Sequence, residues 1–554
     1  MATDTSTAPR STDGFGVIGR WPTLVVATQT GRSALRSGGW WGVVFGLYVA
    51  VQVFAYTSAY KTPLERDQMA AAYSGNIGLD ALFGQAHGIN TVDGYASWRL
   101  LGILGLLGAV WGMLTATRLL RGEEDAGRHE LLMAGQTTLR RAGAQGIAGL
   151  AAGWIALFAF TALGTVVTGR SAAVGFTVGQ SLYFALVLAS SAAVFLALGG
   201  LASQLAGTRR RALSMTAGVF GVCFAMRMVG DTEQGLHWMV WLGPLGWLEQ
   251  ARPLTGPQPL ALLPTWLLVI AAAAAAIHLA GRRDLGSATL PGRDTARPRT
   301  RLLGSTAGLA LHLARPGALA WLSGIAAFSV LLGTVAESST RDVGGDAAIE
   351  QAMVRLGGHG TLVEAYLGLT FIILALMIAL IAAGQASAIR AEEAEGRLEN
   401  LLVRPVGRIR WLVERLGLSA VLLVVASLVA GVSAWAGTIA EHGSASLGAL
   451  AEAGLNTVPP GLFMLGLGTL VLGARPRWVP AVVYGYLAYS FLVELLGAVV
   501  KANHYLMDSA VFFHMTPAPA TGPDWTSAAV VTGLGLAAAA LGAGLLRRRD
   551  LLGA

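Results

Sequence analysis

Twelve apolar stretches dominate this sequence, and each is long enough to cross a lipid bilayer as a helix, which takes about 20 mostly apolar residues. Hydrophobic residues make up 54% of the 554-residue chain and charged residues only 13%, whereas a soluble domain carries about 25% charged residues. The stretches lie near residues 39–59, 98–119, 144–168, 178–206, 212–230, 259–280, 318–337, 361–388, 411–438, 447–473, 478–500 and 526–546. The sequence therefore predicts an all-α polytopic membrane protein.

The positions of the basic residues predict how the chain is oriented in the membrane. When the N-terminus is placed inside, most of the 39 Lys and Arg residues fall in the tail, the linker or the loops on that same side. Because loops rich in Lys and Arg stay in the cytoplasm, both termini are predicted to be cytoplasmic. The net charge of +8 is then explained by topology and does not indicate nucleic-acid binding.

A charged segment occurs twice in this otherwise apolar chain. Both copies fit the pattern R-x-E-E-x-x-G-R-x-E-x-L, the first at residues 121–132 and the second at 390–401. Each copy follows the second apolar stretch of its half of the chain, and both lie on the predicted cytoplasmic side. Chance agreement over such a pattern is improbable in an apolar sequence, which indicates an internal duplication.

The two halves also match outside this segment. The run Arg-Arg-Asp-Leu closes the first half at residues 282–285 and the second at 548–551. Since each half begins inside and contains six apolar stretches, the sequence predicts two parallel six-span repeats that form a pseudo-twofold twelve-span bundle. The predicted parts are a cytoplasmic tail with an amphipathic segment (1–38), the first repeat (39–286), a cytoplasmic linker with a second amphipathic segment (287–316) and the second repeat (317–554).

Each charged segment has the pattern of a short helix with a bend. In both copies a glutamate precedes an arginine by four residues, a spacing at which side chains meet on a helix and contribute about 0.2–0.5 kcal/mol. The two expected pairs are Glu124–Arg128 and Glu393–Arg397. Gly127 and Gly396 interrupt the charged turn, and leucines such as Leu401 and Leu402 then provide an apolar knob suited to a partner's groove. The alternative is a solvated juxtamembrane helix that is repeated only because of the duplication.

The second copy, with the residues that follow it, resembles a known coupling region. Residues 390–408 read R-x-E-E-x-x-G-R-L-E-x-L-L-x-x-P-V-x-R. This is similar to the coupling-helix run of permeases from type-2 ATP-binding-cassette exporters, in particular the fused twelve-span actinobacterial exporters of polyketide antibiotics and multiple drugs. The resemblance implies a multi-pass permease of the bacterial plasma membrane that engages two copies of a separate ATP-binding-cassette ATPase subunit. The implied ATPase-coupling residues are Glu123, Glu124, Gly127, Arg128, Glu130, Glu392, Glu393, Gly396, Arg397 and Glu399.

The first copy departs from the pattern of that family. Gln136 stands where the second copy has Pro405, and His129 stands where it has Leu398. Two docking sites that are not equivalent are therefore expected.

The chain has no phosphate-binding loop of its own. Such a loop ends in Gly-Lys followed by Ser or Thr, and the two lysines, Lys61 and Lys501, follow Tyr60 and Val500. A permease without enzymatic activity is therefore expected, with ATP and Mg²⁺ bound by the partner subunit and no cofactor in this chain. No metal site is predicted, because the external His and Asp residues match no ligand spacing.

Two ionisable residues, Arg227 and Glu494, lie deep within predicted spans. Charged residues in membrane spans are costly and are candidates for function. Both occupy equivalent positions in the two repeats, towards the outer leaflet, and would pair across the pseudo-twofold axis as an outer gate latch. The alternative is that each side chain reaches separately to the outer headgroups.

Aromatic and methionine side chains in the same two spans predict a lining for an apolar substrate. The set comprises Phe220, Phe224, Met226, Tyr486, Tyr489 and Phe491. Aromatic residues at helical spacing also serve ordinary packing, which is the alternative.

These features favour an exporter of small hydrophobic or amphipathic compounds, embedded in membrane lipid, over two other classes. An ion-coupled secondary transporter needs carboxylates within the membrane, and Glu494 is the one convincingly placed. A membrane-embedded lipid-modifying enzyme needs an acid, base or metal cluster at an interface, and the external loops show none with a convincing spacing.

Overall fold

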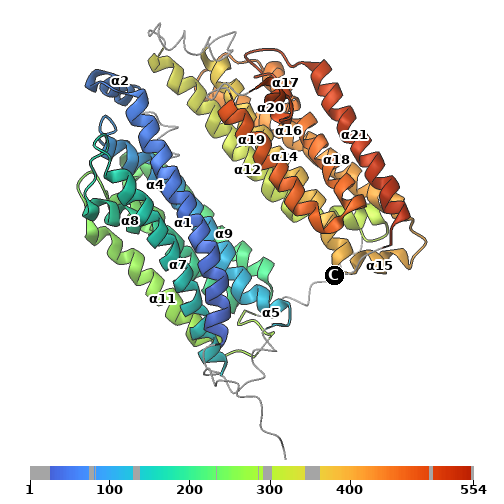
Figure 1. Ribbon diagram of the computed structural model, residues 1–554, viewed down its shortest axis with the longest axis horizontal. Helices are drawn as coiled ribbons and strands as arrows, with labels where there is room; N and C mark the ends of the chain where they lie inside the picture. The colour runs from blue at the N-terminus through green and yellow to red at the C-terminus, as the bar shows by residue number, and fades with distance from the viewer. Residues whose placement is uncertain are drawn as a thin grey trace, which may run out of the picture. The chain divides into compact units, whose positions relative to one another are not determined.

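The computed structural model describes residues 25–73, 80, 83–128, 138–232, 234–284, 286–290, 302–343, 362–497 and 503–550. Every regular element in these residues is helical. They form two compact helical units, one through residue 290 and the other from residue 302 (Figure 1). Each unit has a hydrophobic core of its own.

The first unit is built on six long helices. These are α1 (Val25–Ala59), α4 (Val92–Thr117), α7 (Leu139–Gly169), α8 (Val178–Leu205), α9 (Arg209–Thr232) and α11 (Leu263–Ala280). Shorter elements connect or extend them: α2 (Pro63–Tyr73), the π-helical turn η2 (Arg118–Gly122), α5 (Glu123–Asp125), the 3-10 helix η3 (Gln234–Leu242), α10 (Pro244–Gln250) and the 3-10 turn η4 (Pro259–Leu262).

The second unit also contains six long helices among its described residues. These are α12 (Thr306–Val343), α14 (Leu362–Ala394), α16 (Arg408–Ala440), α18 (Val458–Ala474), α19 (Val479–Gly497) and α21 (Trp525–Arg548). The short elements are α15 (Arg397–Leu402), α17 (Leu447–Leu455), η5 (Pro476–Trp478), α20 (His504–Asp508) and η6 (Val511–His514).

Eleven helical segments of the described residues are long and apolar enough to cross a membrane. This confirms the prediction of an all-α, multi-pass membrane protein. The remaining predicted stretch, residues 478–500, contains α19, a helix of 19 residues that is not among the eleven.

Polar residues explain where several of these helices begin. The side chain of Thr138 accepts a hydrogen bond from the N–H of Arg141 at the start of α7, and Thr177 forms a reciprocal capping box with Gln180 at the start of α8. The side chain of Asp524 caps α21 by accepting hydrogen bonds from the N–H groups of Thr526 and Ser527. Such caps satisfy N–H groups that have no partner within the helix, and each contributes about 1 kcal/mol.

Two helices begin earlier than the sequence predicted. α1 starts at Val25 and α12 at Thr306. Residues 25–38 and 306–316, predicted as parts of separate amphipathic segments, therefore continue directly into the first long helix of each unit.

The predicted span at residues 447–473 is divided into two helices. α17 ends at Leu455 and α18 begins at Val458, with Pro459 and Pro460 in its first turn. Proline is tolerated there because the first N–H groups of a helix have no partner within it. Asn456, at the break, donates a hydrogen bond to the carbonyl oxygen of Thr516 at 2.9 Å.

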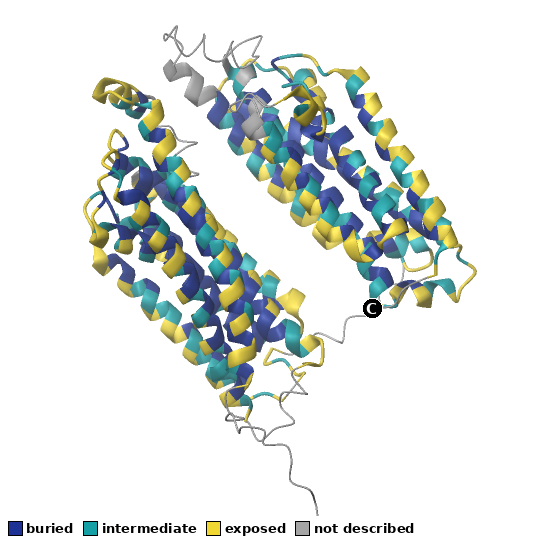
Figure 2. Ribbon diagram, in the orientation of Figure 1, coloured by how far each residue is buried: buried dark blue, intermediate teal, exposed yellow. Residues whose placement is uncertain are grey.

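The helices of the two units pack in the same order. In the first unit α1 packs on α7, α4 on α8 and α8 on α11; in the second, α12 packs on α16, α14 on α18 and α18 on α21. In the first unit α8 is the most buried of the long helices, and α4 follows it. In the second unit α14 and the α17–α18 pair are the most buried, and exposed residues lie on the outward faces of the surrounding helices (Figure 2).

Glycines let the paired helices approach closely. A Cβ atom at Gly38 of α1 would lie 2.0 Å from the carbonyl oxygen of Gly153 in α7. A Cβ atom at Gly466 of α18 would likewise lie 2.0 Å from the carbonyl oxygen of Gly535 in α21. These contacts are of the kind that small residues allow between membrane helices.

Candidate functional site

The first charged segment is a direct continuation of a long helix. α4 runs into the π-helical turn η2, which contains Arg121, and then into α5, which contains Glu124. Single π-helical turns within α-helices are frequent at functional sites. The segment is therefore anchored at its start by a buried helix of the first unit.

Both segments bend at the predicted glycine. Gly127 has a φ of +70° and Gly396 a φ of +69°, a left-handed conformation that costs a residue with a Cβ about 1–2 kcal/mol. In the second unit α14 ends at Ala394 and α15 begins at Arg397, on either side of the bend. The predicted bend is confirmed in both copies.

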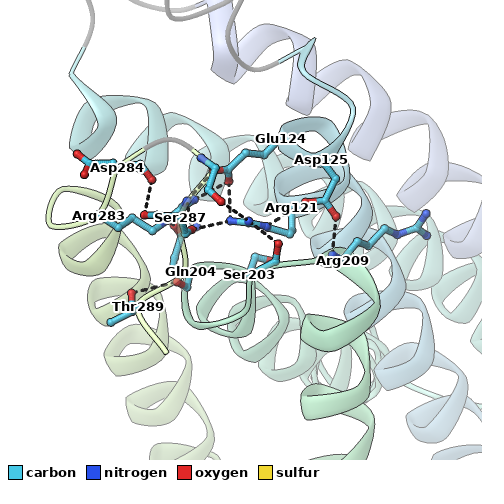
Figure 3. Close-up of polar contacts among 12 residues, drawn as sticks. Arg121, Glu124, Asp125, Ser203, Gln204, Arg209, Arg283, Asp284, Ser287 and Thr289 are labelled. Carbon is cyan, nitrogen blue, oxygen red and sulfur yellow. Dashed lines mark hydrogen bonds and ion pairs between the residues drawn. The ribbon is translucent and has the colours of Figure 1, made fainter. Parts of the chain in front are cut away.

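Arg121 lies at the centre of a polar network in the first unit (Figure 3). Its side chain is only 2% exposed and pairs with Glu124 at 3.3 Å and with Asp125 at 3.1 Å. Its guanidinium also donates hydrogen bonds to the carbonyl oxygens of Gly207, Gly286 and Ser287, at 2.6, 3.2 and 3.0 Å. This places one buried cation between the charged segment, the α8–α9 turn and the chain that follows α11.

Glu124 binds an arginine far away in the sequence. Each of its carboxylate oxygens accepts a hydrogen bond from Arg283 at 2.6 Å, and the N–H of Gly286 donates to it at 2.8 Å. The predicted Glu124–Arg128 pair is therefore wrong. Arg128 instead makes a bidentate contact with Glu123 at 2.6 and 2.8 Å, and this hydrogen bonding raises the pKa of the exposed Arg128 guanidinium.

The second unit repeats the long-range contact. Both carboxylate oxygens of Glu393 accept hydrogen bonds from Arg549, at 2.6 and 2.7 Å. The predicted Glu393–Arg397 pair is not what the structure shows, because Arg397 pairs with Glu395 at 2.9 Å. The physical reason is the bend at Gly396, which takes Arg397 off the helix that carries Glu393.

These two contacts join features that the sequence had matched separately. Arg283 and Arg549 are the second arginines of the two Arg-Arg-Asp-Leu runs, and Glu124 and Glu393 are the second glutamates of the two charged segments. We call each contact a Glu–Arg clamp: Glu124–Arg283 in the first unit and Glu393–Arg549 in the second. The duplicated acid and the duplicated arginine were visible in the sequence, but nothing along the chain indicated that they bind each other.

The first glutamate of the pattern behaves differently in the two units. Glu123 lies at the surface with Arg128, whereas Glu392 is buried against Arg415 of α16, each side chain being 10% exposed. The indole N–H of Trp411 also donates to Glu392 at 3.3 Å. The second segment is therefore tied to the third long helix of its unit as well as to the residues after α21.

The exposed residues of the segments form the surface available to a partner. In the second unit Arg397 and Glu399 are exposed, and Val403, just after α15, is 88% exposed. Leu401 and Leu402, predicted as a docking knob, instead pack partly buried against the core of their own unit. Glu130 lies outside the described residues.

Arg227 and Glu494 belong to different units. Arg227 is 5% exposed and has partners in its own unit, Asp231 at 3.3 Å and Glu249 at 3.9 Å. Glu494 lies partly buried on α19. Their pairing across the two units stays a prediction.

The predicted lining residues pack largely within their own units. Phe220 contacts Phe195 edge to face, with ring centroids 5.4 Å apart, and lies 6.3 Å from Phe224. Phe491 meets Phe512 at 6.4 Å. Met226 is partly buried on α9. The Tyr486 hydroxyl donates a hydrogen bond to the carbonyl oxygen of Ser509, and the hydroxyl groups of Tyr489 and Ser509 are hydrogen-bonded to each other. Of the predicted set, Tyr486 also borders a cavity of about 300 Å³ in the second unit.

Within the described residues, no group of three or more His, Cys, Asp or Glu side chains is arranged to hold a metal ion. The site is thus a set of buried ion pairs around two charged segments. These ion pairs hold each segment to other parts of its own unit.

Comparison with known proteins places the chain among transporters. The family model described as "Multidrug efflux system permease Rv1217c, C-terminal domain" matches residues 32–283 and 303–547. The multidrug efflux system permease protein Rv1217c of Mycobacterium tuberculosis (strain ATCC 25618 / H37Rv) is 30% identical over 519 residues, which cover 90% of each chain.

Proposed function

The chain belongs to the family of the multidrug efflux system permease Rv1217c, and from this premise we propose that it forms the membrane pathway of an ATP-driven efflux pump. In this proposal it is a type-2 ATP-binding-cassette permease of the fused kind that exports polyketide antibiotics and other drugs. It lies in the bacterial plasma membrane with cytoplasmic termini, and its two units are parallel six-span repeats. Its substrates are hydrophobic or amphipathic compounds, which suits spans with few fixed charges.

The repeated Glu–Arg clamp is the observation that carries this proposal. Each clamp holds the end of one long helix to the residues beside the last long helix of the same unit, across 159 residues in the first unit and 156 in the second. A force applied to the charged segment would therefore move both helices together, as a packed rigid element. Removing one partner of a buried pair is strongly destabilising, so the pair keeps the segment from yielding locally.

Two copies of an ATP-binding-cassette ATPase subunit would bind the exposed faces of the segments. Those faces include Glu123 and Arg128 in the first unit, and Arg397, Glu399 and Val403 in the second. Glu124, Glu392 and Glu393 are engaged inside their own units and act as positioning residues. ATP and Mg²⁺ would be bound by the partner subunits, and closure of the two ATPases would switch the pathway from inward-open to outward-open.

Charge reversal at the exposed face tests this proposal. Arg128→Glu and Arg397→Glu, alone and together, are expected to lower the ATP hydrolysis of the complex purified with its ATPase subunit, and ATP-dependent efflux with it. Arg170→Glu is the matched control, because Arg170 is an exposed arginine in the turn after α7, away from both charged segments. Full hydrolysis and efflux by the double variant would remove the docking assignment.

A proton-coupled transporter is the second candidate, and one observation favours it. Asp231 and Glu249 lie together beside the single guanidinium of Arg227 in the first unit, and the side chain of Asp231 is 1% exposed. Buried carboxylates of this kind serve as proton relays in transporters. Efflux that persists without ATP and collapses with the proton gradient would favour this candidate over the first.

A further inference from the structure

The second unit contains a cavity that the charged segments do not explain. Its volume is about 300 Å³, and it lies between α18, α19, α21 and η6. The cavities beside Asp231 and Glu124 in the first unit are about 30 Å³ each, enough for one or two water molecules. Small-molecule sites begin at about 300 Å³, so this cavity is large enough for an organic ligand.

The walls of the cavity are mainly apolar and aromatic. Val511, Val530, Val531 and Leu534 line it, together with an aromatic pair, Phe463 and Tyr486, whose ring centroids lie 5.7 Å apart. Val530 and Leu534 are each 57% exposed on one face of α21, so the cavity is bordered there by the surface of the unit. An apolar molecule could enter along this face.

The polar residues that line the cavity are Asp508 of α20, His514 of η6, and Thr526 and Ser527 in the first turn of α21. His514 Nε2 donates a hydrogen bond to the backbone carbonyl of Asp508 at 2.8 Å, which leaves Nδ1 without a proton in the neutral ring. Asp524 is already engaged by the first N–H groups of α21 and by the Ser527 hydroxyl. The carboxylate of Asp508, in contrast, has no hydrogen bond or ion pair to any side chain within the described residues.

A second acid lies close to the same end. Glu494 lies on α19, which packs against η6, and its Oε2 is buried without a hydrogen-bond partner among the described residues. Asp508 is the one acidic residue among those that line the cavity, and no lysine or arginine is among them. An acidic side chain without a basic neighbour in the lining favours a positively charged ligand at this end.

We propose that this cavity binds lipophilic organic cations, with the apolar body against Phe463, Tyr486 and α21 and the positive charge towards Asp508. Aromatic faces attract cations as well as apolar groups, so the walls and the charged end favour the same class of ligand. This inference takes its biological meaning from the proposed efflux function, for which it names a substrate class. The binding itself does not depend on an ATPase.

Direct binding to the purified full-length chain in lipid nanodiscs tests the proposal. The probes are tetraphenylphosphonium and tetraphenylborate, which share a shape and carry opposite charges, and each is titrated separately by calorimetry against empty nanodiscs. The cation is expected to bind saturably and the anion is not. Equal binding of both ions would show an apolar surface without charge selection and would overturn the proposal.

Three variants locate the binding. Val530→Trp fills the cavity from an exposed wall position and is expected to weaken binding of the cation about tenfold, because the indole ring occupies part of the space of the ligand. Asp508→Asn removes the charge and is expected to weaken binding about tenfold, the effect of losing one charged contact. Leu541→Trp is the matched control, because Leu541 is 63% exposed on the same helix and does not line the cavity. Unfolding temperatures of all three variants show whether each is folded.

The outcomes separate this inference from the proposed function. Unchanged binding in folded Val530→Trp and Asp508→Asn overturns the site, whatever the pump does. Selective binding that these variants abolish supports the site even if no ATPase activity accompanies the chain, in which case the efflux proposal alone fails.

Discussion

The two charged segments share one contact and differ in almost every other. In both units the second glutamate binds the second arginine of the Arg-Arg-Asp-Leu run, with N–O distances of 2.6 to 2.7 Å. In the first unit Arg121 contacts both Glu124 and Asp125, so that these three residues and Arg283 form one network of four charges. In the second unit the two acids are distributed over separate arginines, Arg415 and Arg549.

This difference shows which part of the duplicated pattern both units use in the same way. The clamp needs two residues that are far apart in the sequence, and both halves have them. The first arginine of the pattern has no common role: Arg121 is buried in the network, whereas no hydrogen bond or ion pair of Arg390 is found among the described residues. The same pattern in the sequence therefore supports two different sets of neighbours around one shared contact.

The largest expected effect is the difference in stability between alanine variants of these two arginines. Arg121→Ala should destabilise the protein by about 3–5 kcal/mol, because it leaves Glu124 and three carbonyl groups with fewer partners in a buried setting. Arg390→Ala should cost far less. Thermal unfolding of the two purified variants measures the difference, and equal losses would show that the two arginines have the same role after all.

Exchanging the charges of a clamp tests whether the contact itself matters. Glu393→Arg places a second cation beside Arg549 and should destabilise the protein by about 3 kcal/mol or more. The double variant Glu393→Arg with Arg549→Glu should recover part of the stability and of the ATP hydrolysis. The same exchange at Glu124 and Arg283 should recover less, because Arg121 remains beside position 124. Absence of any recovery in the second unit would contradict the clamp.

Replacing the glycine at either bend should destabilise the protein by a similar amount, although the other contacts of the two charged segments differ. No atom lies within 4 Å of a Cβ built at Gly127 or Gly396, so alanine costs only the left-handed backbone, about 1–2 kcal/mol in each unit. Asparagine, which tolerates this conformation, should cost less at both positions. Unfolding temperatures of the four variants check this, and a clearly unequal pair of alanine variants would mean that a partner contacts one of the bends.

The smallest effect on stability is expected at the surface pair of the first unit. Arg128 is 60% exposed and Glu123 is 28% exposed, so Arg128→Gln should leave the unfolding temperature unchanged within measurement, as exposed ion pairs often do. The variant should nevertheless lower ATP hydrolysis by the complex if this face binds the ATPase. If Arg128→Gln lowered the stability of the protein but left ATP hydrolysis unchanged, the Glu123–Arg128 pair would have a structural role, and its assignment to the docking surface would be wrong.

The sequence predicted the helices and the bends well because those depend on local chemistry. Apolar stretches of about 20 residues predict spans, and a glycine after a charged turn indicates a left-handed residue. The prediction for the segment's ion pairs was wrong for the same reason. The spacing rule considers only side chains one turn apart on a single helix, so it paired Glu124 with Arg128 although the preferred partner, Arg283, is 159 residues away.

The sequence by itself determined that this is a multi-pass helical membrane protein with a duplicated charged segment that bends at Gly127 and Gly396. Only the tertiary structure decided what the charges bind. Arg283 and Arg549 reach the two segments because each unit packs the helix that carries the segment and its last long helix against one common helix, α8 in the first unit and α18 in the second. A buried carboxylate needs a cation wherever the fold supplies one, and the fold supplied it from the far end of each half.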